Sequence, residues 1–186
     1  MEALIGITYA GAIALSLLVL EKSATGTEHI KEMLVGTILT VSWHTVSQIG
    51  MLVLAVGTVH FFARKRFLLI SEHPQEAERQ GLRIWWWDII FYTTFGLTVI
   101  TSVRVAGVLL VFALLTIPAV SAMICVTATM SRVIFGWIFG LIGCTVGLEV
   151  SLWADIAAGP SIITTLLVLL LLSSLVKILS KEILNR

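Results

Sequence analysis

IWWWDIIFYTTFGLTVITSVRVAGVLLVFALLTIPAVSAMICVTA, residues 84–128, decides the fold of this chain. Asp88 and Arg104 are the only charged residues in it. At about 1.5 Å per residue, a single helix over this stretch would be about twice as long as the ~30 Å hydrocarbon core of a bilayer. We therefore predict two membrane-spanning helices here, with a turn at Thr101–Arg104 and a kink at Pro118.

Four further apolar segments lie on either side of this stretch, at residues 3–20, 33–63, 133–150 and 160–179. The first has only Glu2 ahead of it and no Lys or Arg, so we interpret it as a retained span and not as a signal peptide. The second is too long for one crossing. We expect in it a short membrane-inserted piece, a break, and a full span ending at about Phe62, because its middle carries the polar group Ser42, Trp43, His44, Ser47 and Gln48.

The composition agrees with a protein that lives in a membrane. Of the 186 residues, 58% are hydrophobic and 12% are charged, and the mean hydropathy is +1.04. A soluble domain carries about 25% charged residues. The predicted fold class is therefore all-α, a polytopic bundle of about six transmembrane helices that forms a single domain over residues 1–186.

Charge and cysteine usage exclude other classes. The net charge of +1 offers no basic surface for nucleic acid, which is not an expected partner. The two cysteines, Cys125 and Cys144, fall inside apolar runs without a CxxC pair, so neither a disulfide framework nor a zinc knuckle is expected.

The distribution of Lys and Arg predicts the orientation, because cytoplasmic loops carry an excess of these residues. If residues 64–83 are cytoplasmic, alternation of the spans places nine basic residues on the cytoplasmic side: Arg64, Lys65, Arg66, Arg79, Arg83, Arg132, Lys177, Lys181 and Arg186. Lys22, Lys31 and Arg104 remain on the other side. We predict a multi-pass protein of the cell (inner) membrane with both termini in the cytoplasm.

The polar segment at residues 71–83 contains SEHPQEAERQG. Pro74 suits the first position of a helix, Glu76 and Glu78 suit its positive N-terminal end, and Gly81 suits a C-cap. A two-turn helix outside the membrane is predicted, and a helix so short needs a surface to pack on. The residues leave two interpretations open: a docking element for a cytoplasmic partner, or a capped helix resting on its own bundle.

Glycines recur along the fifth predicted span, where their spacing of four, three and four residues lines one helical face with Gly136, Gly140, Gly143 and Gly147. A face without side chains lets another helix approach closely. Packing inside the bundle is the favoured interpretation, and a subunit interface is the alternative.

Ionisable residues at membrane depth are candidates for function. His44 is a candidate metal ligand, although a polar residue that satisfies a helix break explains it better. Glu149 and Asp155 lie near the outer end of their span, where they are either solvated or attract a cation to an outer mouth. Together these three residues form the candidate metal pathway.

Several enzyme signatures are absent from the sequence, among them HExxH, the G-x-S-x-G elbow and the Walker A loop. We therefore expect a chain that is not an enzyme, needs no cofactor, and depends on a separate subunit for any ATP hydrolysis.

Several motifs then occur in a recognisable order. EAERQGL is followed by RVAGVLLVFALLTIPAVSAMI and ADIAAGPSIITTLLVLLLLSSL, with EALIGITYA and GTEHIKEMLVGTIL ahead of them. This order resembles the C-terminal half to two-thirds of the permease subunits of metal-type ABC importers, which serve zinc, manganese and iron. The resemblance implies a type II importer-like bundle in which the helix around Pro74 is the coupling helix, with its contact to the ATPase formed by Glu76, Ala77 and Gly81.

The same resemblance implies the partners: an ATP-binding subunit, an extracytoplasmic metal-binding protein, a second permease copy in a homodimer, and membrane lipid. The function it predicts is ATP-driven import of a divalent transition metal ion, zinc or manganese first and iron next. Family members carry further spans ahead of the matched region, and we expect those N-terminal spans to be missing here. Two alternatives stay open, a permease for a metal chelate or vitamin-like compound and a truncated, non-transporting membrane protein.

Overall fold

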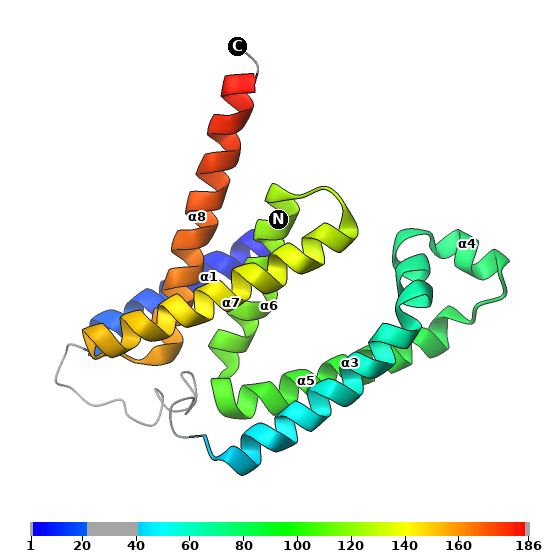
Figure 1. Cartoon of the computed structure of the whole chain (residues 1–186), viewed down its shortest axis with the longest axis horizontal. Helices are drawn as coiled ribbons and strands as arrows, with labels where there is room; N and C mark the ends of the chain where they lie inside the picture. Colours follow the sequence, from blue (N-terminus) through cyan, green and yellow to red (C-terminus); the bar gives the residue numbers. More distant parts are fainter. Residues whose placement is uncertain (1, 22–40, 185–186) are drawn as a thin grey trace. The chain divides into compact units, whose positions relative to one another are not determined.

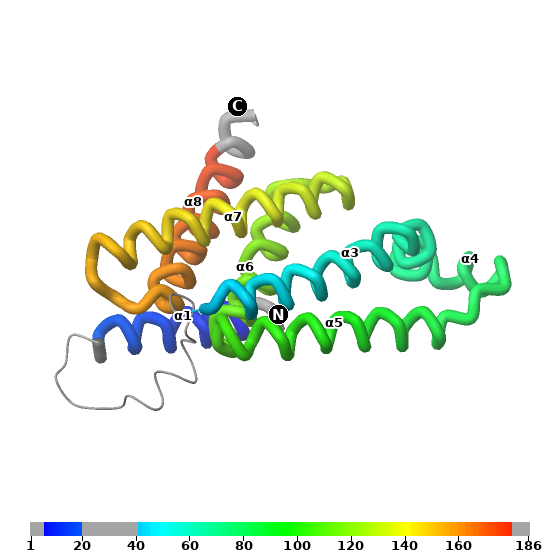
Figure 2. The backbone as a smooth tube through the Cα atoms, turned by 60° about the horizontal axis from the view of Figure 1, so that its bottom comes forward, coloured from blue at the N-terminus to red at the C-terminus, as the bar shows by residue number. Residues whose placement is uncertain are grey.

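The computed structural model describes residues 2–21 and 41–184 of the chain, with side chains for 6–19 and 41–179. Every element within these ranges is a helix (Figures 1 and 2). The helices are α1 (Glu2–Glu21), α3 (Trp43–Glu72), α4 (Pro74–Arg79), α5 (Ile84–Ala106), α6 (Val108–Cys125), α7 (Thr129–Ala154) and α8 (Ala158–Leu184). The predicted all-α class is confirmed.

Five of these helices, α3, α5, α6, α7 and α8, are long and apolar enough to cross a membrane. The remaining predicted span corresponds to α1, in which the shorter stretch Gly6–Val19 is apolar. The structure thus has the helices expected of a polytopic membrane protein.

The structure describes only the later side of the predicted break in the second span, where a helix starts. The α3 helix begins at Trp43, and Ser42 caps it by accepting a hydrogen bond at Oγ from the backbone N–H of Thr45, at 3.3 Å. The short inserted piece expected before the break lies largely in residues 33–40, outside the described residues. At its other end α3 does not stop at Phe62, where the predicted span ends, but continues to Glu72.

The predicted turn at Thr101–Arg104 is wrong. These residues lie in the last turns of α5, and the break between α5 and α6 is at Gly107. Gly107 has φ +81°, a backbone conformation that residues with a Cβ adopt only at a cost. Arg104 is helical because a cation is favourable in the last turn of a helix, close to the unpaired carbonyl groups.

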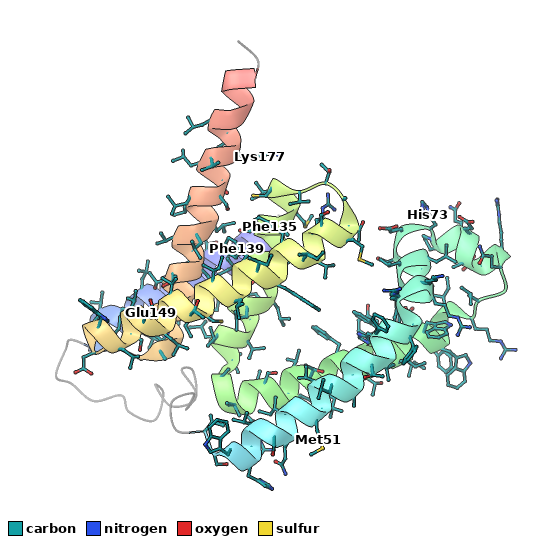
Figure 3. All side chains as sticks on the ribbon, in the orientation of Figure 1. Met51, His73, Phe135, Phe139, Glu149 and Lys177 are labelled. Atoms are coloured by element: carbon teal, nitrogen blue, oxygen red, sulfur yellow. The ribbon has the colours of Figure 1, made fainter. Side chains whose placement is uncertain are left out.

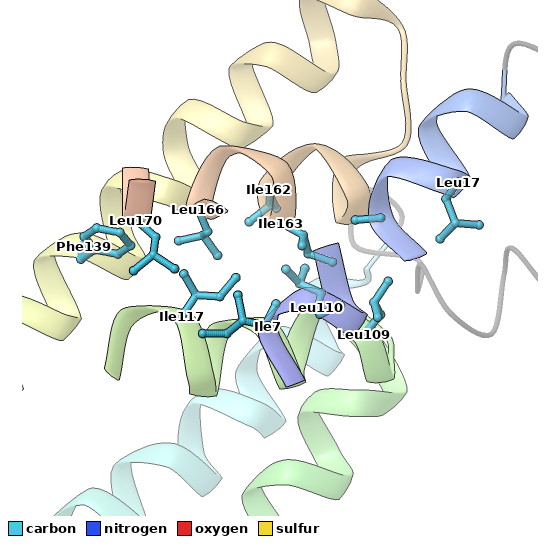
Figure 4. Close-up of a cluster of buried hydrophobic side chains, with 13 residues drawn as sticks. Ile7, Leu17, Leu109, Leu110, Ile117, Phe139, Ile162, Ile163, Leu166 and Leu170 are labelled. Carbon is cyan, nitrogen blue, oxygen red and sulfur yellow. The ribbon is translucent and has the colours of Figure 1, made fainter. Parts of the chain in front are cut away.

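The chain divides into two compact units, residues 40–104 and the remainder. The unit formed by the remainder, called here the packed unit, consists mainly of α1, α6, α7 and α8, and α8 contacts each of the other three helices. Figure 4 shows its core, in which the largest fully buried apolar side chains are Leu110, Ile117, Ile163 and Leu166. Close packing of this kind associates helices in lipid, where the hydrophobic effect gives no net attraction between them.

Residues 40–104 form the second unit, called here the hairpin unit, with α3, α4 and most of α5. Ring contacts join its two long helices. The edge of the Phe67 ring meets Trp87, with ring centroids 5.5 Å apart, and the His60 ring stacks on Phe91 at 5.8 Å. These contacts bring the C-terminal half of α3 beside the N-terminal half of α5.

A hydrogen bond accompanies these rings: His60 Nε2 lies 2.9 Å from Thr94 Oγ1. The Thr94 hydroxyl donates its hydrogen to its own helix, where the carbonyl oxygens of Ile90 and Phe91 lie at 2.8 and 2.9 Å. The direction of the bond between His60 and Thr94 depends on which nitrogen of the His60 ring carries the hydrogen.

Candidate functional site

The first candidate site is α4 and the corner that leads into it. His73 is both the C-cap of α3 and the N-cap of α4 (Figure 3). Its N–H donates to the carbonyl of Leu69 at 2.8 Å, and its own carbonyl accepts from the N–H groups of Glu76 and Ala77, both at 3.1 Å. Pro74 occupies the first turn, where a missing N–H costs no helical hydrogen bond. The corner therefore satisfies the backbone groups of both helices.

A Schellman motif ends α4. The Gly81 N–H donates to the carbonyl of Glu78 at 2.9 Å, and the Leu82 N–H donates to that of Ala77 at 3.0 Å. Gly81 follows the C-cap residue, Gln80, and has φ +75°. A Cβ at Gly81 would meet nothing within 4 Å, so the backbone conformation, and not lack of space, favours glycine there.

The α4 helix has one buried residue. Ala77 is 0% exposed, and α4 packs on α3. Gln75, Glu76, Glu78 and Arg79 are all exposed. A helix of six residues is thus seated through one small side chain and presents polar and charged side chains to its surroundings. This arrangement suits recognition by another protein.

The three residues of the candidate metal pathway are all exposed. His44 lies in the first turn of α3, in the hairpin unit. Glu149 belongs to the packed unit, where it lines a shallow hollow with Val150, Trp153 and Ala154 (Figure 3). Asp155 ends α7 with φ 54°, a conformation that Asp tolerates better than most residues. Among the side chains that the structure describes, no three His, Cys, Asp or Glu residues are grouped so that they could hold a metal ion.

The four glycines of α7 meet different neighbours. A Cβ on Gly143 would overlap the side chain of Leu166, and one on Gly147 would lie 2.6 Å from the Cα of Ile162, so this half of the glycine face lies against α8. A Cβ on Gly136 or Gly140 would lie 3.8 Å from the nearest atom of Pro118 in α6, which is ordinary van der Waals contact. All of these contacts are within the packed unit.

Sequence reasoning missed two buried serines that accompany the glycines. Ser161, in the first turn of α8, donates from Oγ to the carbonyl of Gly147 at 2.7 Å. Ser151 donates to the carbonyl of Ile156 at 2.6 Å. Serines near a glycine face could have predicted these hydrogen bonds, because serine hydroxyl groups join helices in membranes.

Sequence reasoning also missed two basic side chains that donate hydrogen bonds to the C-terminal end of α6. Arg132 Nε donates to the carbonyl of Val126 at 2.8 Å, and Lys177 Nζ donates to that of Cys125 at 3.3 Å. These carbonyls lie at the C-terminal end of α6, where a cation is favourable. Arg132 and Lys177 therefore tie α7 and α8 to the end of α6.

Comparison with known proteins gives a consistent family. A family model described as "ABC 3 transport family" matches residues 1–177. The chain is 29% identical over 175 residues to the "Manganese import system permease protein ScaB" of Streptococcus gordonii, covering 91% of this chain and 60% of the relative. It is 25% identical over 162 residues to the "Chelated iron transport system membrane protein YfeD" of Yersinia pestis, covering 87% of this chain and 54% of the relative.

A solved structure shares the fold. It is titled "PsaBC from Streptococcus pneumoniae in complex with Fab" and matches with a TM-score of 0.72 and 22% sequence identity. The match covers 84% of this chain and 56% of that chain. The chain therefore spans a little over half the length of the proteins it matches.

Proposed function

Because the chain belongs to the ABC 3 transport family, we propose that it is a membrane-spanning permease subunit of an ATP-driven importer for a divalent transition metal ion. Manganese is the cargo that the relatives support best, since the Streptococcus gordonii protein is named for manganese import. Iron comes next, because the Yersinia pestis relative is named for chelated iron transport. Zinc, which the sequence also favoured, is named by neither of these two relatives.

The observation that carries this proposal is the seating of α4. The helix is capped at both ends, anchored by Ala77, and exposes Glu76 at its first turn. We assign α4 as the coupling helix that docks on an ATP-binding subunit, with Glu76 in the contact. Pro74 and Gly81 hold its ends, and Ala77 seats it on α3. The 30 residues of α3 and the 23 of α5 then connect this contact to the membrane.

The remaining partners follow from the same assignment. ATP is hydrolysed on the separate subunit, an extracytoplasmic binding protein delivers the ion, and a second permease copy completes the membrane part. We propose that Glu149 and Asp155 attract the ion at the outer mouth, with His44 as a further transient ligand. Carboxylate oxygens suit Mn²⁺, and a pathway with scattered ligands releases its ion, whereas a tight cage would retain it.

Metal content tests the proposal. Cellular manganese, iron and zinc are measured by elemental mass spectrometry under metal limitation, with the gene deleted and then restored. We expect a fall in manganese that restoration reverses. Unchanged metal content after deletion would contradict the importer function.

Two variants test the coupling helix. Glu76→Gln and Gly81→Ala are expected to abolish restoration of metal content, the first by removing a charge from the docking surface and the second by straining a backbone at φ +75°. Gly57→Ala is the matched control, because a Cβ there meets nothing within 4 Å and Gly57 is helical without a positive φ. All three proteins should insert in the membrane at equal amounts. If both test variants restore metal content, α4 is not the coupling helix.

A chelated cargo is the second candidate, favoured by the name of the Yersinia pestis relative. Uptake of radioactive metal is compared with and without a chelator that the cells do not otherwise import. Uptake of the free ion that the chelator suppresses supports the primary proposal. Uptake that requires the chelator supports the second.

A further inference from the structure

Basic residues are concentrated in α3 directly after its apolar run. Arg64, Lys65 and Arg66 follow Ala63 without interruption, and all three side chains are exposed. In both views of the chain the last turns of α3 run in a different direction from its first turns (Figures 1 and 2). A straight helix of 30 residues would be about 45 Å long, which exceeds a hydrocarbon core of ~30 Å. The three basic residues therefore lie where α3 leaves the core of the membrane.

Three tryptophans begin α5 in the same unit. Trp85, Trp86 and Trp87 follow Arg83 and Ile84, at the point where the polar segment ends and the second long helix starts. Trp85 is 65% exposed and Trp86 is 52% exposed, and their rings meet edge to face with centroids 4.9 Å apart. Tryptophan concentrates at the level of the lipid headgroups, where its ring meets apolar chains and its N–H meets polar groups.

One contact brings a cation of α3 beside a tryptophan of α5. The guanidinium carbon of Arg66 lies 5.0 Å from the centroid of the Trp87 ring. The guanidinium of Arg64 lies 4.7 Å from the ring of Phe61, one turn earlier in α3. These cation–π contacts restrict the two arginines at the membrane boundary while leaving their side chains exposed.

We propose that Arg64, Lys65, Arg66 and Arg83, together with Trp85 and Trp86, form a binding surface for the headgroups of anionic phospholipids. Arginine donates paired hydrogen bonds to phosphate oxygens, and a lysine adds a compact charge beside them. Clusters of four or more basic residues next to a membrane span attract anionic lipids. The exposed side chains of Trp85 and Trp86 follow Arg83 within three residues, so a lipid bound at this end of α5 would contact both ring and cation.

Two observations favour a lipid over an acidic protein surface as the occupant. The cations lie beside the apolar run of α3, at the edge of the membrane, and one of them, Arg66, lies beside a tryptophan of α5. The element that projects further from the membrane, α4, carries exposed Glu76 and Glu78. The inference depends only on the chain spanning a membrane, so it stands or falls separately from the proposed metal transport.

Lipid retention tests the surface. The full chain is purified in mild detergent, equilibrated with equal amounts of phosphatidylglycerol and phosphatidylcholine of matched acyl chains, and examined by native mass spectrometry for retained lipid. The wild-type chain should retain phosphatidylglycerol in excess. Arg64→Gln with Arg66→Gln should lower that excess by about fivefold for each charge removed. The control with the same change in net charge is Arg79→Gln with Arg104→Gln, two arginines outside the six residues of the proposed surface, and it should keep the excess.

An unchanged excess in the Arg64→Gln, Arg66→Gln protein would overturn the inference, as would an equal loss in both double variants, which would reflect net charge alone. A variant that keeps phosphatidylglycerol but no longer binds the ATP-binding subunit would also overturn it, by assigning the surface to a protein partner. A salt titration of the wild-type chain keeps the inference testable if the variant fails to fold. The excess of phosphatidylglycerol should decline steadily from about 0.1 M to about 1 M NaCl, because salt screens the attraction between exposed charges over this range. A constant excess would contradict the proposal.

Discussion

The helices of the packed unit and the helices of the hairpin unit are held together by different kinds of contact. In the membrane-spanning window of α6, 44% of the residues are buried, against 6% in α3 and none in α5. Glycines, branched side chains and a buried serine hydroxyl hold the packed unit together. Aromatic rings and the His60–Thr94 hydrogen bond join α3 to α5. Tight packing resists deformation, whereas a few ring contacts permit adjustment. The helices attached to α4 are therefore held by fewer buried side chains than α6, α7 and α8.

The largest effect on this comparison is expected from Gly147→Ala. The new Cβ would lie 2.6 Å from the backbone Cα of Ile162, so α7 and α8 must separate, and overpacking of this kind costs about 1–3 kcal/mol. Unfolding in detergent, followed by circular dichroism, measures the change. Gly96→Ala in the hairpin unit is the control, since a Cβ there meets nothing within 4 Å and should leave stability unchanged or slightly higher. Equal stability of the two variants would show that α7 and α8 are not tightly packed.

An intermediate effect is expected from Ser161→Ala. The change removes the 2.7 Å bond to the Gly147 carbonyl, and stability should fall by about 1 kcal/mol. Ser47→Ala is the control, because Ser47 is exposed and bonds only within its own helix, to the carbonyl of His44 at 2.8 Å. The same denaturation experiment compares the two proteins. A loss as large in Ser47→Ala would assign the effect to helix propensity instead of the contact between helices.

The smallest effect is expected from His60→Phe, which keeps a ring against Phe91 and Phe67 but removes the bond to Thr94. Hydrogen bonds between membrane helices contribute about 0.6 kcal/mol on average. A double-mutant cycle with Thr94→Val isolates this bond from the changes in packing. A coupling energy of zero would mean that the rings alone join α3 to α5.

Hydropathy and local patterns predicted much of the fold. The apolar runs located α5, α6, α7 and α8, because a helix is the only form in which a single segment can satisfy its backbone groups in lipid. Pro74 and Gly81 marked the two ends of α4, since their backbone preferences act locally. The turn between α5 and α6 was misplaced because Thr101, Ser102 and Arg104 resemble a polar turn, whereas the positive φ at Gly107 made the actual break.

At the candidate sites too, the sequence predicted the local features and only the structure showed the contacts between distant residues. The sequence placed Glu76 on a short helix outside the apolar runs, but only the structure showed Ala77 buried against its own chain and Glu76 exposed. The glycine face of α7 was visible in the spacing of its residues, and its partners Leu166 and Ile162 were not. The contact between Arg66 and Trp87, two residues 21 positions apart in the sequence, was likewise absent from any local pattern.

The sequence by itself determined that this protein is a set of apolar helices with a capped polar segment, because hydropathy, proline and glycine act over a few neighbouring residues. Only the tertiary structure decided which helices are tightly packed and which are held by a few rings. That choice depends on the shapes of side chains brought together from distant parts of the chain. Gly147 lies against Ile162 and Ser161 because α7 and α8 cross there, and no spacing within either helix specifies that crossing.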